Sequence, residues 1–390
     1  MSYAQFIRLL SALFLIYFTS ACGSGGSTDI VEVEQVDPPI EEPVEMTVLS
    51  DGSEVETAAL IAIGEKIYND TNLSNPTGQS CASCHALDTG FDDPNSANPT
   101  SIGADGISFG TRNSPTASYT AHIPELHTET RNPPNGGADI EVLVGGLFVD
   151  GRAVSLEEQA KGPFLNPIEM GNASEQDVIE KISASDYAND FETLFGANIL
   201  QDTTRSYNYL ADAIAAFERT ELFSPFTSKF DRVEQNTDAF TASEQRGHDL
   251  FFGRAGCDRC HNSPQGSPQL FSNFEYQNIG VPKNPQLPAL IDDPSFIDLG
   301  LGAITGDPRD DGRFRAPNLR NIAITSPYMH NGVFTTLQEV VEFYNTRDTS
   351  FNQPPEVDRN VDNAQDIGEI GLSSQDINDI VAFLNTLTDQ

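Results

Sequence analysis

The sequence of 390 residues contains few basic residues, no tryptophan, four methionines, five cysteines and no long apolar run. Its 21 lysines and arginines face 58 acidic residues, which gives a net charge of −37. Nucleic-acid binding needs a basic face that replaces phosphate counterions, so this composition argues against it. The same charge disfavours adsorption to an anionic membrane surface. It makes a basic macromolecular partner more plausible than an acidic one, although an acidic surface also serves solubility alone.

The 38% of hydrophobic residues suffices for folded cores, and the length predicts two domains.

The longest apolar stretch lies at the N-terminus. Arg8 precedes Leu9–Phe18, which is far shorter than the ~20 residues that a membrane-spanning helix requires. Together with the small residues that follow, this pattern predicts a secretory signal peptide over residues 1–22. Cys22 resembles the lipidated cysteine of a bacterial lipobox, although Thr19 stands where leucine is usual. We therefore expect a periplasmic protein with a lipid anchor in the outer membrane; a free secreted protein with an incidental cysteine is the alternative.

An acidic segment without lysine or arginine follows, over residues 23–53, and it includes Pro38, Pro39 and Pro43. Such a segment repels itself and has little apolar material to bury. The composition predicts a disordered tether.

The remaining four cysteines form two copies of the pattern Cys-x-x-Cys-His. The residues are Cys81, Cys84, His85, Cys257, Cys260 and His261. This pattern is typical of covalent c-type haem attachment. Two thiols one helical turn apart can bind the haem vinyl groups, and the adjacent histidine can bind the iron. The sequence therefore predicts two covalently bound haems. Alternatives are one four-cysteine zinc site or two redox dithiols. The zinc site would need the two pairs to converge and would not explain the histidines, and a dithiol favours a strand–helix junction that neither site shows.

Apolar periodicity predicts a mostly α-helical protein in which a helix and a loop precede each motif. A capping box at Thr241–Glu244 opens the helix before the second motif. The expected helices are 54–70, 175–194, 207–221, 241–252, 337–344 and 375–387. We expect two cytochrome-c-like haem domains with long loops, residues 54–235 and 236–390. The loops 88–137 and 262–318 would wrap around haem.

Several longer stretches resemble the bacterial di-haem cytochrome c peroxidase/MauG family, over roughly residues 54–388. They are Arg112–Thr116, Asp150–Ala153, Leu156–Pro163, Asn166–Met170, Asn278–Pro282, Phe314–Asn321 and Pro327–Gly332. The resemblance implies that the first haem is peroxidatic and leaves one iron position open, while the second transfers electrons. Glu169 matches the family's acid/base carboxylate, and Gln159 and Pro163 match residues of the same pocket.

The resemblance also implies further ligands. Tyr344 occupies the position of the second haem's sixth ligand in the MauG branch, with Met329 as the rival. His330 is expected to form a hydrogen bond within its turn rather than bind iron. A calcium ion is implied between the haems, with oxygen ligands from Asn113, Thr325 and Pro327.

The sequence departs from the family at two positions. Val149 replaces a tryptophan that is thought to couple the haems, and the chain has no tryptophan elsewhere. Ala104 stands where some relatives carry a histidine that blocks the first haem at rest. His122 and His127 lie in an expected insertion, 117–147, and could replace that histidine; surface histidines are the simpler interpretation.

These features predict an enzyme that reduces hydrogen peroxide to water with electrons from a small c-type cytochrome or copper protein. One alternative is MauG-like oxidation of a protein side chain by high-valent haems, and another is a di-haem electron-transfer lipoprotein or sensor without turnover. The sequence names neither the electron donor nor the oligomeric state, and a homodimer is compatible with it.

Overall fold

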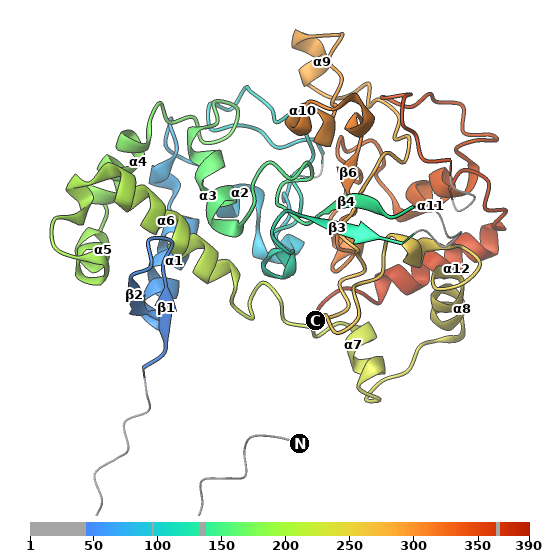
Figure 1. Cartoon of the computed structure of the whole chain (residues 1–390), viewed down its shortest axis with the longest axis horizontal. Coiled ribbons are helices and arrows are strands. Elements are labelled where there is room, and N and C mark those ends of the chain that lie inside the picture. The colour runs from blue at the N-terminus through green and yellow to red at the C-terminus, as the bar shows by residue number, and fades with distance from the viewer. Residues whose placement is uncertain (1–43, 96, 133–137, 364–366) are drawn as a thin grey trace, which may run out of the picture. The chain divides into compact units, whose positions relative to one another are not determined.

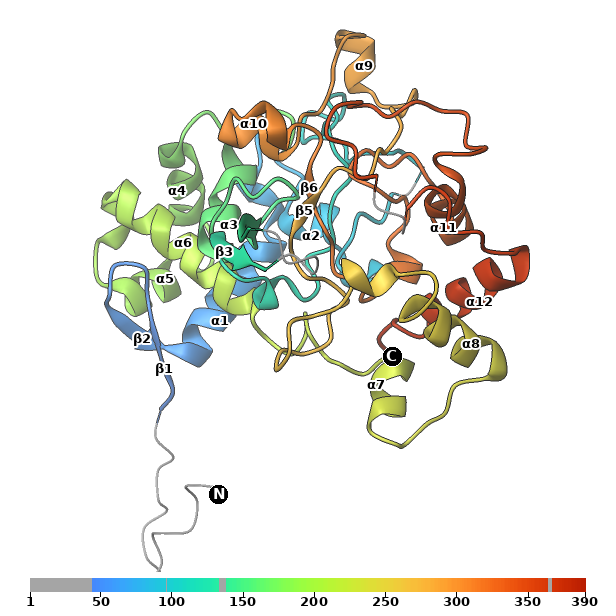
Figure 2. The same cartoon turned by 45° about the vertical axis from the view of Figure 1, so that its right-hand side comes forward.

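The computed structural model describes residues 44–390, apart from 96, 133–137 and 364–366. The signal peptide, Cys22 and residues 23–43 of the expected tether lie outside the described residues. Helices dominate the described part, and its strands form three two-stranded antiparallel sheets (Figures 1 and 2). The mostly α-helical prediction is confirmed.

The α-helices are α1 (Thr57–Asn69), α2 (Cys81–Cys84), α3 (Leu156–Leu165), α4 (Glu175–Ser183), α5 (Ala188–Phe195), α6 (Thr203–Glu218), α7 (Lys229–Glu234), α8 (Ala242–Phe251), α9 (Ala289–Asp292), α10 (Leu301–Thr305), α11 (Leu337–Thr346) and α12 (Ser374–Asn385). The strands are β1 (Met46–Val48), β2 (Glu54–Glu56), β3 (His127–Arg131), β4 (Ile140–Val144), β5 (Tyr276–Gln277) and β6 (Phe314–Arg315). They pair as β1–β2, β3–β4 and β5–β6.

The tether prediction is wrong for residues 44–53. Strand β1 pairs with β2, and Leu49 in the turn between them is buried in the core of the first half. The Ser50 hydroxyl donates to Asp212 Oδ2 on α6 at 2.9 Å, and the Tyr209 hydroxyl donates to Asp51 at 2.7 Å. A short hairpin can fold in an acidic segment because one or two buried apolar residues and these cross-chain hydrogen bonds fix it.

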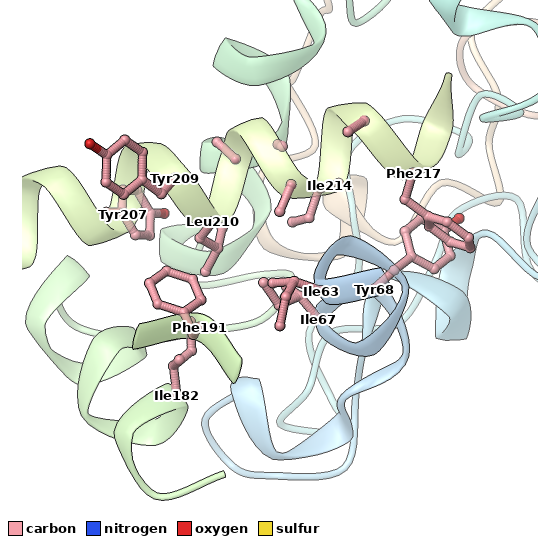
Figure 3. Packing of buried hydrophobic residues seen from close by; sticks show 14 of the residues in the cluster. Ile63, Ile67, Tyr68, Ile182, Phe191, Tyr207, Tyr209, Leu210, Ile214 and Phe217 are labelled. Atoms are coloured by element: carbon pink, nitrogen blue, oxygen red, sulfur yellow. The ribbon is translucent and has the colours of Figure 1, made fainter. Parts of the chain in front are cut away.

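In the first half, α1 crosses α6 and their apolar faces form a core (Figure 3). Gly64 permits the close approach, since a Cβ atom at this position would overlap the carbonyl oxygen of Ala213. Around the crossing, Ile63 and Ile67 of α1 lie against α6, and the Tyr68 ring meets the Phe217 ring edge-on at 5.4 Å between centroids. The crossing places the C-terminal end of α1 next to the loop that leads to the first Cys-x-x-Cys-His motif.

In the second half, α8 crosses α12 in the same manner. A Cβ atom at Gly247 would overlap the carbonyl oxygen of Asp379 and lie 2.9 Å from the Cβ atom of Phe383. The expected capping box opens α8, because the Thr241 hydroxyl accepts from the Glu244 backbone and the Glu244 carboxylate accepts from the Thr241 backbone. This half has its own hydrophobic cluster, which includes residues of α8, α11 and α12.

Other boundaries differ from the expected ones. The helix expected over 175–194 is two helices, α4 and α5, because the chain turns at Ala184–Tyr187 and buries Ile182 and Phe191 from different directions. The loop expected over 88–137 contains β3, and the loop expected over 262–318 contains short helices and strands.

Residues 44–390 form one compact unit. The division at residue 235 into two haem domains therefore stays a prediction, supported by the separate hydrophobic clusters of the two halves. Among the described residues, none of the helices is both long and apolar enough to span a membrane.

Candidate active site: a cavity shared by two Cys-x-x-Cys-His motifs

A single cavity of about 990 Å³ is lined by both Cys-x-x-Cys-His motifs. The first motif forms the one-turn helix α2, and the second begins with a turn of 3-10 helix at Cys257–Arg259. None of these four cysteines forms a disulfide within the described residues. Both motifs therefore present their thiols and imidazoles to one space between the two halves of the sequence.

The surroundings of the thiols do not favour the two alternatives to haem attachment, which are redox dithiols and a four-cysteine zinc site. Burial raises the pKa of Cys260 to about 11 and that of Cys257 to about 12. Redox dithiols need the opposite, a lowered thiol pKa that stabilises the thiolate. Within the described part of the chain, no group of three or more Cys, His, Asp or Glu side chains is placed to hold a metal ion, so the four cysteines do not form one zinc site.

Each motif histidine is oriented by a backbone carbonyl. Nδ1 of His85 lies 3.2 Å from the carbonyl oxygen of Phe91, and Nδ1 of His261 lies 2.9 Å from that of Phe271. Both phenylalanines have left-handed backbone conformations, with φ of 59° and 56°. Because a carbonyl only accepts hydrogen bonds, Nδ1 carries the proton and Nε2 is left as a ligand. Burial also lowers the pKa of both histidines and keeps the imidazoles neutral.

The cavity contains buried polar atoms without a partner in the described residues. They are Gln79 Oε1, Asp92 Oδ1, Ser101 Oγ and Arg315 Nε. Buried polar groups are normally hydrogen-bonded, so such atoms indicate a space that a polar-edged ligand completes. Paired thiols, free imidazole nitrogens and a large cavity with these atoms at its wall fit the c-type haem group.

The three residues expected to act on peroxide all line this cavity. Gln159 and Pro163 lie on α3, and Glu169 lies in the turn after it. The Asn166 side chain donates to Glu169 Oε1 at 2.9 Å. Burial raises the pKa of Glu169, while the charge of Arg152 and the hydrogen bond from Asn166 oppose the rise. A carboxyl group in this setting holds a proton more readily than an exposed one, as an acid/base residue requires.

Ala104 is attached directly to the turn that contains Glu169. Its backbone N–H donates to the Glu169 carbonyl at 2.7 Å. The side chain at this position is a methyl group, so it offers no ligand to the cavity.

The two histidines of the expected insertion lie away from the cavity wall. His122 packs beside Phe226, with 5.4 Å between ring centroids, and His127 on β3 is exposed and pairs with Glu129 at 2.9 Å. Neither belongs to the described residues that line the cavity. The simpler interpretation, surface-loop histidines, agrees with these positions.

Tyr344 and Met329 both line the cavity, near the second motif. Tyr344 lies on α11, and its pKa is raised by burial and by the nearby Cys260 and Cys257. Met329 lies in a turn and has a left-handed backbone, with φ of 72°. Both candidates thus line the cavity, Tyr344 lies near Cys260 and Cys257, and the ligand assignment stays a prediction.

His330 does not form the hydrogen bond within its turn that the sequence suggested. Its Nε2 atom lies 3.2 Å from Glu356 Oε2, and its ring stacks on Phe314 with 3.8 Å between centroids. The partner lies 26 residues further along the chain, which a local sequence pattern cannot reveal.

The expected calcium ligands are brought together in part. The Asn113 side-chain amide donates to the Pro327 carbonyl at 2.6 Å, and Thr325 lines the same cavity. A cation between these groups would require the amide to turn, so that its oxygen replaces its nitrogen. The donor types suit Ca²⁺.

Sequence reasoning missed a charged network at the cavity wall. Arg112 donates to both oxygens of Asp298, at 2.5 and 2.7 Å, and to Asp150 at 2.6 Å. Asp150 also accepts from Arg152 at 2.8 Å. Burial alone would raise the pKa of Asp298, but Arg112 lowers it below its ordinary value. Arg112 and Asp150 lie in recognised motifs, whereas nothing near Asp298 in the sequence signals the pairing.

Sequence reasoning also missed Glu218, a buried carboxyl at the end of α6 that lines the cavity. Burial raises its pKa to about 8. An acidic residue on a helix is usually solvated, so only the packing of α6 against the first motif identifies it.

Comparisons with known proteins agree with this site. Residues 58–239 match the di-haem cytochrome c peroxidase family. The chain is 39% identical to the methylamine utilization protein MauG of Paracoccus denitrificans over 356 residues, which cover 85% of this chain and 89% of the relative. It is 32% identical to the cytochrome c551 peroxidase of Nitrosomonas europaea, over 85% of this chain and 81% of the relative.

A solved structure shows the same fold. The diheme peroxidase BthA from Burkholderia thailandensis superimposes with a TM-score of 0.75 at 32% identity, over 89% of this chain and 94% of that one. Two haem-attachment motifs in one cavity, long sequence matches and this shared fold agree, and the chain therefore belongs to the di-haem cytochrome c peroxidase family of oxidoreductases.

Proposed function

We propose that this chain is a periplasmic di-haem peroxidase that reduces hydrogen peroxide to water with electrons from a small c-type cytochrome or copper protein. The observation that carries the proposal is that Glu169, Gln159 and Pro163 line the same cavity as the first Cys-x-x-Cys-His motif. The second motif lines this cavity too, so electrons delivered to the second haem have a short route to the first.

The residues around the first site have distinct roles in this proposal. When bound, the first haem supplies an iron that binds peroxide and passes it electrons. His85 Nε2 would hold that iron, oriented by the Phe91 carbonyl. Ala104 has a methyl side chain, so this position would offer no further ligand to that iron.

Glu169 moves the proton. Its carboxylate would take a proton from one peroxide oxygen and return it to the other, which leaves as water. Two electrons and two protons in total convert one peroxide into two waters. Asn166 fixes the Glu169 carboxylate by its hydrogen bond at 2.9 Å, and Arg152 supplies a positive charge beside it.

At the second motif, His261 and Tyr344 would hold the iron of the second haem, with Met329 as the rival of Tyr344. This haem would transfer electrons. A calcium ion held by Asn113, Thr325 and Pro327 would lie between the haem sites. Calcium removal with a chelator should then alter the spectra of the haems, and unchanged spectra and activity would remove calcium from the proposal.

Oxidation of a protein side chain is the second candidate function. It is favoured by Tyr344 at the second site, which matches the MauG branch, and by the 39% identity to the MauG protein. The absence of tryptophan, with Val149 at the coupling position, weakens it.

The haem assignment is tested first. Acid–acetone extraction should leave the colour on the protein, and the pyridine haemochrome should give about two haems per chain, one for each motif. A single retained haem would show that one motif has been misread.

Turnover is then tested by mixing the two-haem protein with peroxide and a reduced cytochrome or copper protein. Rapid spectral change with peroxide and oxidation of the donor support the peroxidase. Peroxide consumption without donor oxidation favours the second candidate, and no reaction with peroxide would leave only electron transfer or sensing.

Electron paramagnetic resonance of the oxidised protein tests the open first site. We expect a high-spin ferric signal, since Ala104 stands where some relatives carry a blocking histidine, and reaction with peroxide without prior reduction. Two low-spin signals alone, together with a requirement for half-reduction, would show that another residue blocks the site.

A further inference from the structure

Arg315 is a buried cation without an acidic partner in the described residues. It lies on β6, only 8% of its surface is exposed, and it lines the cavity. Its Nε atom has no hydrogen-bond partner, and Nη1 has only a long contact, 3.5 Å, with the Ala316 carbonyl. Burial lowers its pKa, which reflects the cost of an unpaired charge.

The other buried arginines of the described residues, Arg320 and Arg347, are both paired. Arg320 Nη1 lies 2.6 Å from Asp231, and Arg347 Nη2 lies 2.7 Å from Asp348. The half-buried Arg112 is likewise held by Asp298 and Asp150. Arg320 is the sharpest contrast, because it lies five residues further along the same segment. Removing a guanidinium from water is unfavourable unless a counter-charge and hydrogen bonds compensate.

The chain could easily have supplied a carboxylate, since it has 58 acidic residues. That none of the acidic residues in the described part of the chain lies against Arg315 indicates that the anion comes from the ligand in the cavity. Haem carries two propionate carboxylates, and the planar guanidinium suits such a group because it donates two parallel hydrogen bonds.

The surroundings of Arg315 assign it to the second haem. Strand β6 pairs with β5, and the Arg315 guanidinium lies 5.8 Å from the centroid of the Phe274 ring. Phe274 follows Phe271, whose carbonyl orients His261, by three residues. The carbonyl of Pro317, two residues after Arg315, also affects His261. Arg315 thus belongs to the loops that hold the second imidazole.

We propose that Arg315 binds a propionate carboxylate of the second haem. This inference rests on the assignment of two haems, and it adds a binding residue that neither the motifs nor the comparisons specify. A cation at the propionate also stabilises the ferrous state relative to the ferric state, because it offsets the negative charge next to the iron.

The test is spectroelectrochemistry of the two-haem protein, with pyridine haemochrome on every variant. Arg315→Gln should lower the reduction potential of the second haem, by an amount that corresponds to roughly a ten- to hundredfold change in the ferric-to-ferrous ratio. Arg315→Lys keeps the charge but loses the two-donor contact, so a smaller fall is expected. The matched control is Arg313→Gln, which removes an exposed charge two residues away.

The possible outcomes distinguish a failure of the proposed role of Arg315 from a failure of the two-haem assignment. The inference is supported if the reduction potential of the second haem falls in Arg315→Gln, falls less in Arg315→Lys and does not change in Arg313→Gln. Unchanged potentials with both haems attached would overturn it, as would a shift confined to the first haem, which would place the propionate there. If Arg315→Gln does not fold, Arg315→Lys decides, because an unshifted potential in that variant would contradict the two-donor contact. Fewer than two haems in the wild-type protein would instead contradict the haem assignment.

Discussion

The two halves of the chain share one framework around their haem motifs and differ at the positions that face the cavity. Gly64 meets the carbonyl of Ala213, and Gly247 meets that of Asp379. In each case the next contact is the Cβ atom of a phenylalanine one turn later, at 3.0 Å for Phe217 and 2.9 Å for Phe383. The imidazoles are oriented in the same way, by carbonyls of left-handed phenylalanines.

The two halves differ at the residue that follows each of these phenylalanines. Glu218 follows Phe217, and Leu384 follows Phe383; both are buried and line the cavity. The first site also has Glu169 in its wall, whereas the second has Tyr344. In the function proposed above, the shared framework would hold a haem in each half, and the residues added to it would determine whether protons are handled there.

The largest effect is expected from Glu169→Gln. Loss of a positioned acid/base should slow peroxide cleavage by ~10²–10⁴-fold, while both haems and the fold remain. Stopped-flow mixing with peroxide measures the rate. Glu158→Gln is the matched control, because Glu158 is exposed on the neighbouring α3 and pairs only with Lys161. A rate within a few-fold of wild type for Glu169→Gln would remove this carboxyl from the mechanism.

Tyr344→Phe should change only the second site. An anionic oxygen ligand stabilises ferric iron, so its loss should raise the reduction potential of the second haem and alter its spectrum. Met329→Leu is the comparison variant and should leave both unchanged. The reverse pattern would make Met329 the ligand and would remove the match to the MauG branch.

Gly64→Ala and Gly247→Ala test whether the two crossings are equivalent. Each added methyl group overlaps a facing carbonyl, so each variant should lose about 1–3 kcal/mol of unfolding free energy. The helix propensity of alanine, better by up to ~1 kcal/mol, offsets only part of this loss. Guanidinium unfolding followed by circular dichroism measures both. A neutral result for one variant would show that its crossing is looser than the other.

The buried Glu218 predicts that the stability of the wild-type protein depends on pH more strongly than that of the Glu218→Gln variant. Its pKa is about 8 in the folded protein against an ordinary 4.5, so between these values the folded state keeps a proton that the unfolded chain releases. Stability should therefore fall as the pH rises through this window, by at most ~1.4 kcal/mol per pH unit. Glu218→Gln should flatten this dependence and become more stable than wild type at the alkaline end. Parallel pH profiles of the two proteins would show that Glu218 ionises normally.

Sequence reasoning succeeded where the chemistry is local. The haem motifs are pentapeptides, and the capping box of α8 spans four residues, so each could be identified without knowledge of the fold. Glu169, Gln159 and Pro163 lie within ten residues of one another, and the structure brings them to one cavity.

The remaining features depend on contacts between distant segments. Asp298 pairs with Arg112, from which it is separated by 186 residues in the sequence. Glu356 pairs with His330, from which it is separated by 26 residues. The missing partner of Arg315 is likewise a property of its three-dimensional surroundings. The break between α4 and α5 contains neither glycine nor proline, and the hairpin at 46–56 has only Leu49 and Val55 as buried anchors, so neither left a clear signal.

The hairpin of β1 and β2 also limits how far the enzyme can move if Cys22 is lipidated. Residues 44–53, expected to extend the tether, are instead fixed to α6 through Ser50 and Asp51. A fully extended chain spans at most ~3.6 Å per residue, so fixing these residues shortens the maximal distance between membrane and enzyme by roughly 35 Å. With such an anchor, the enzyme would therefore work closer to the membrane than the longer tether would have allowed.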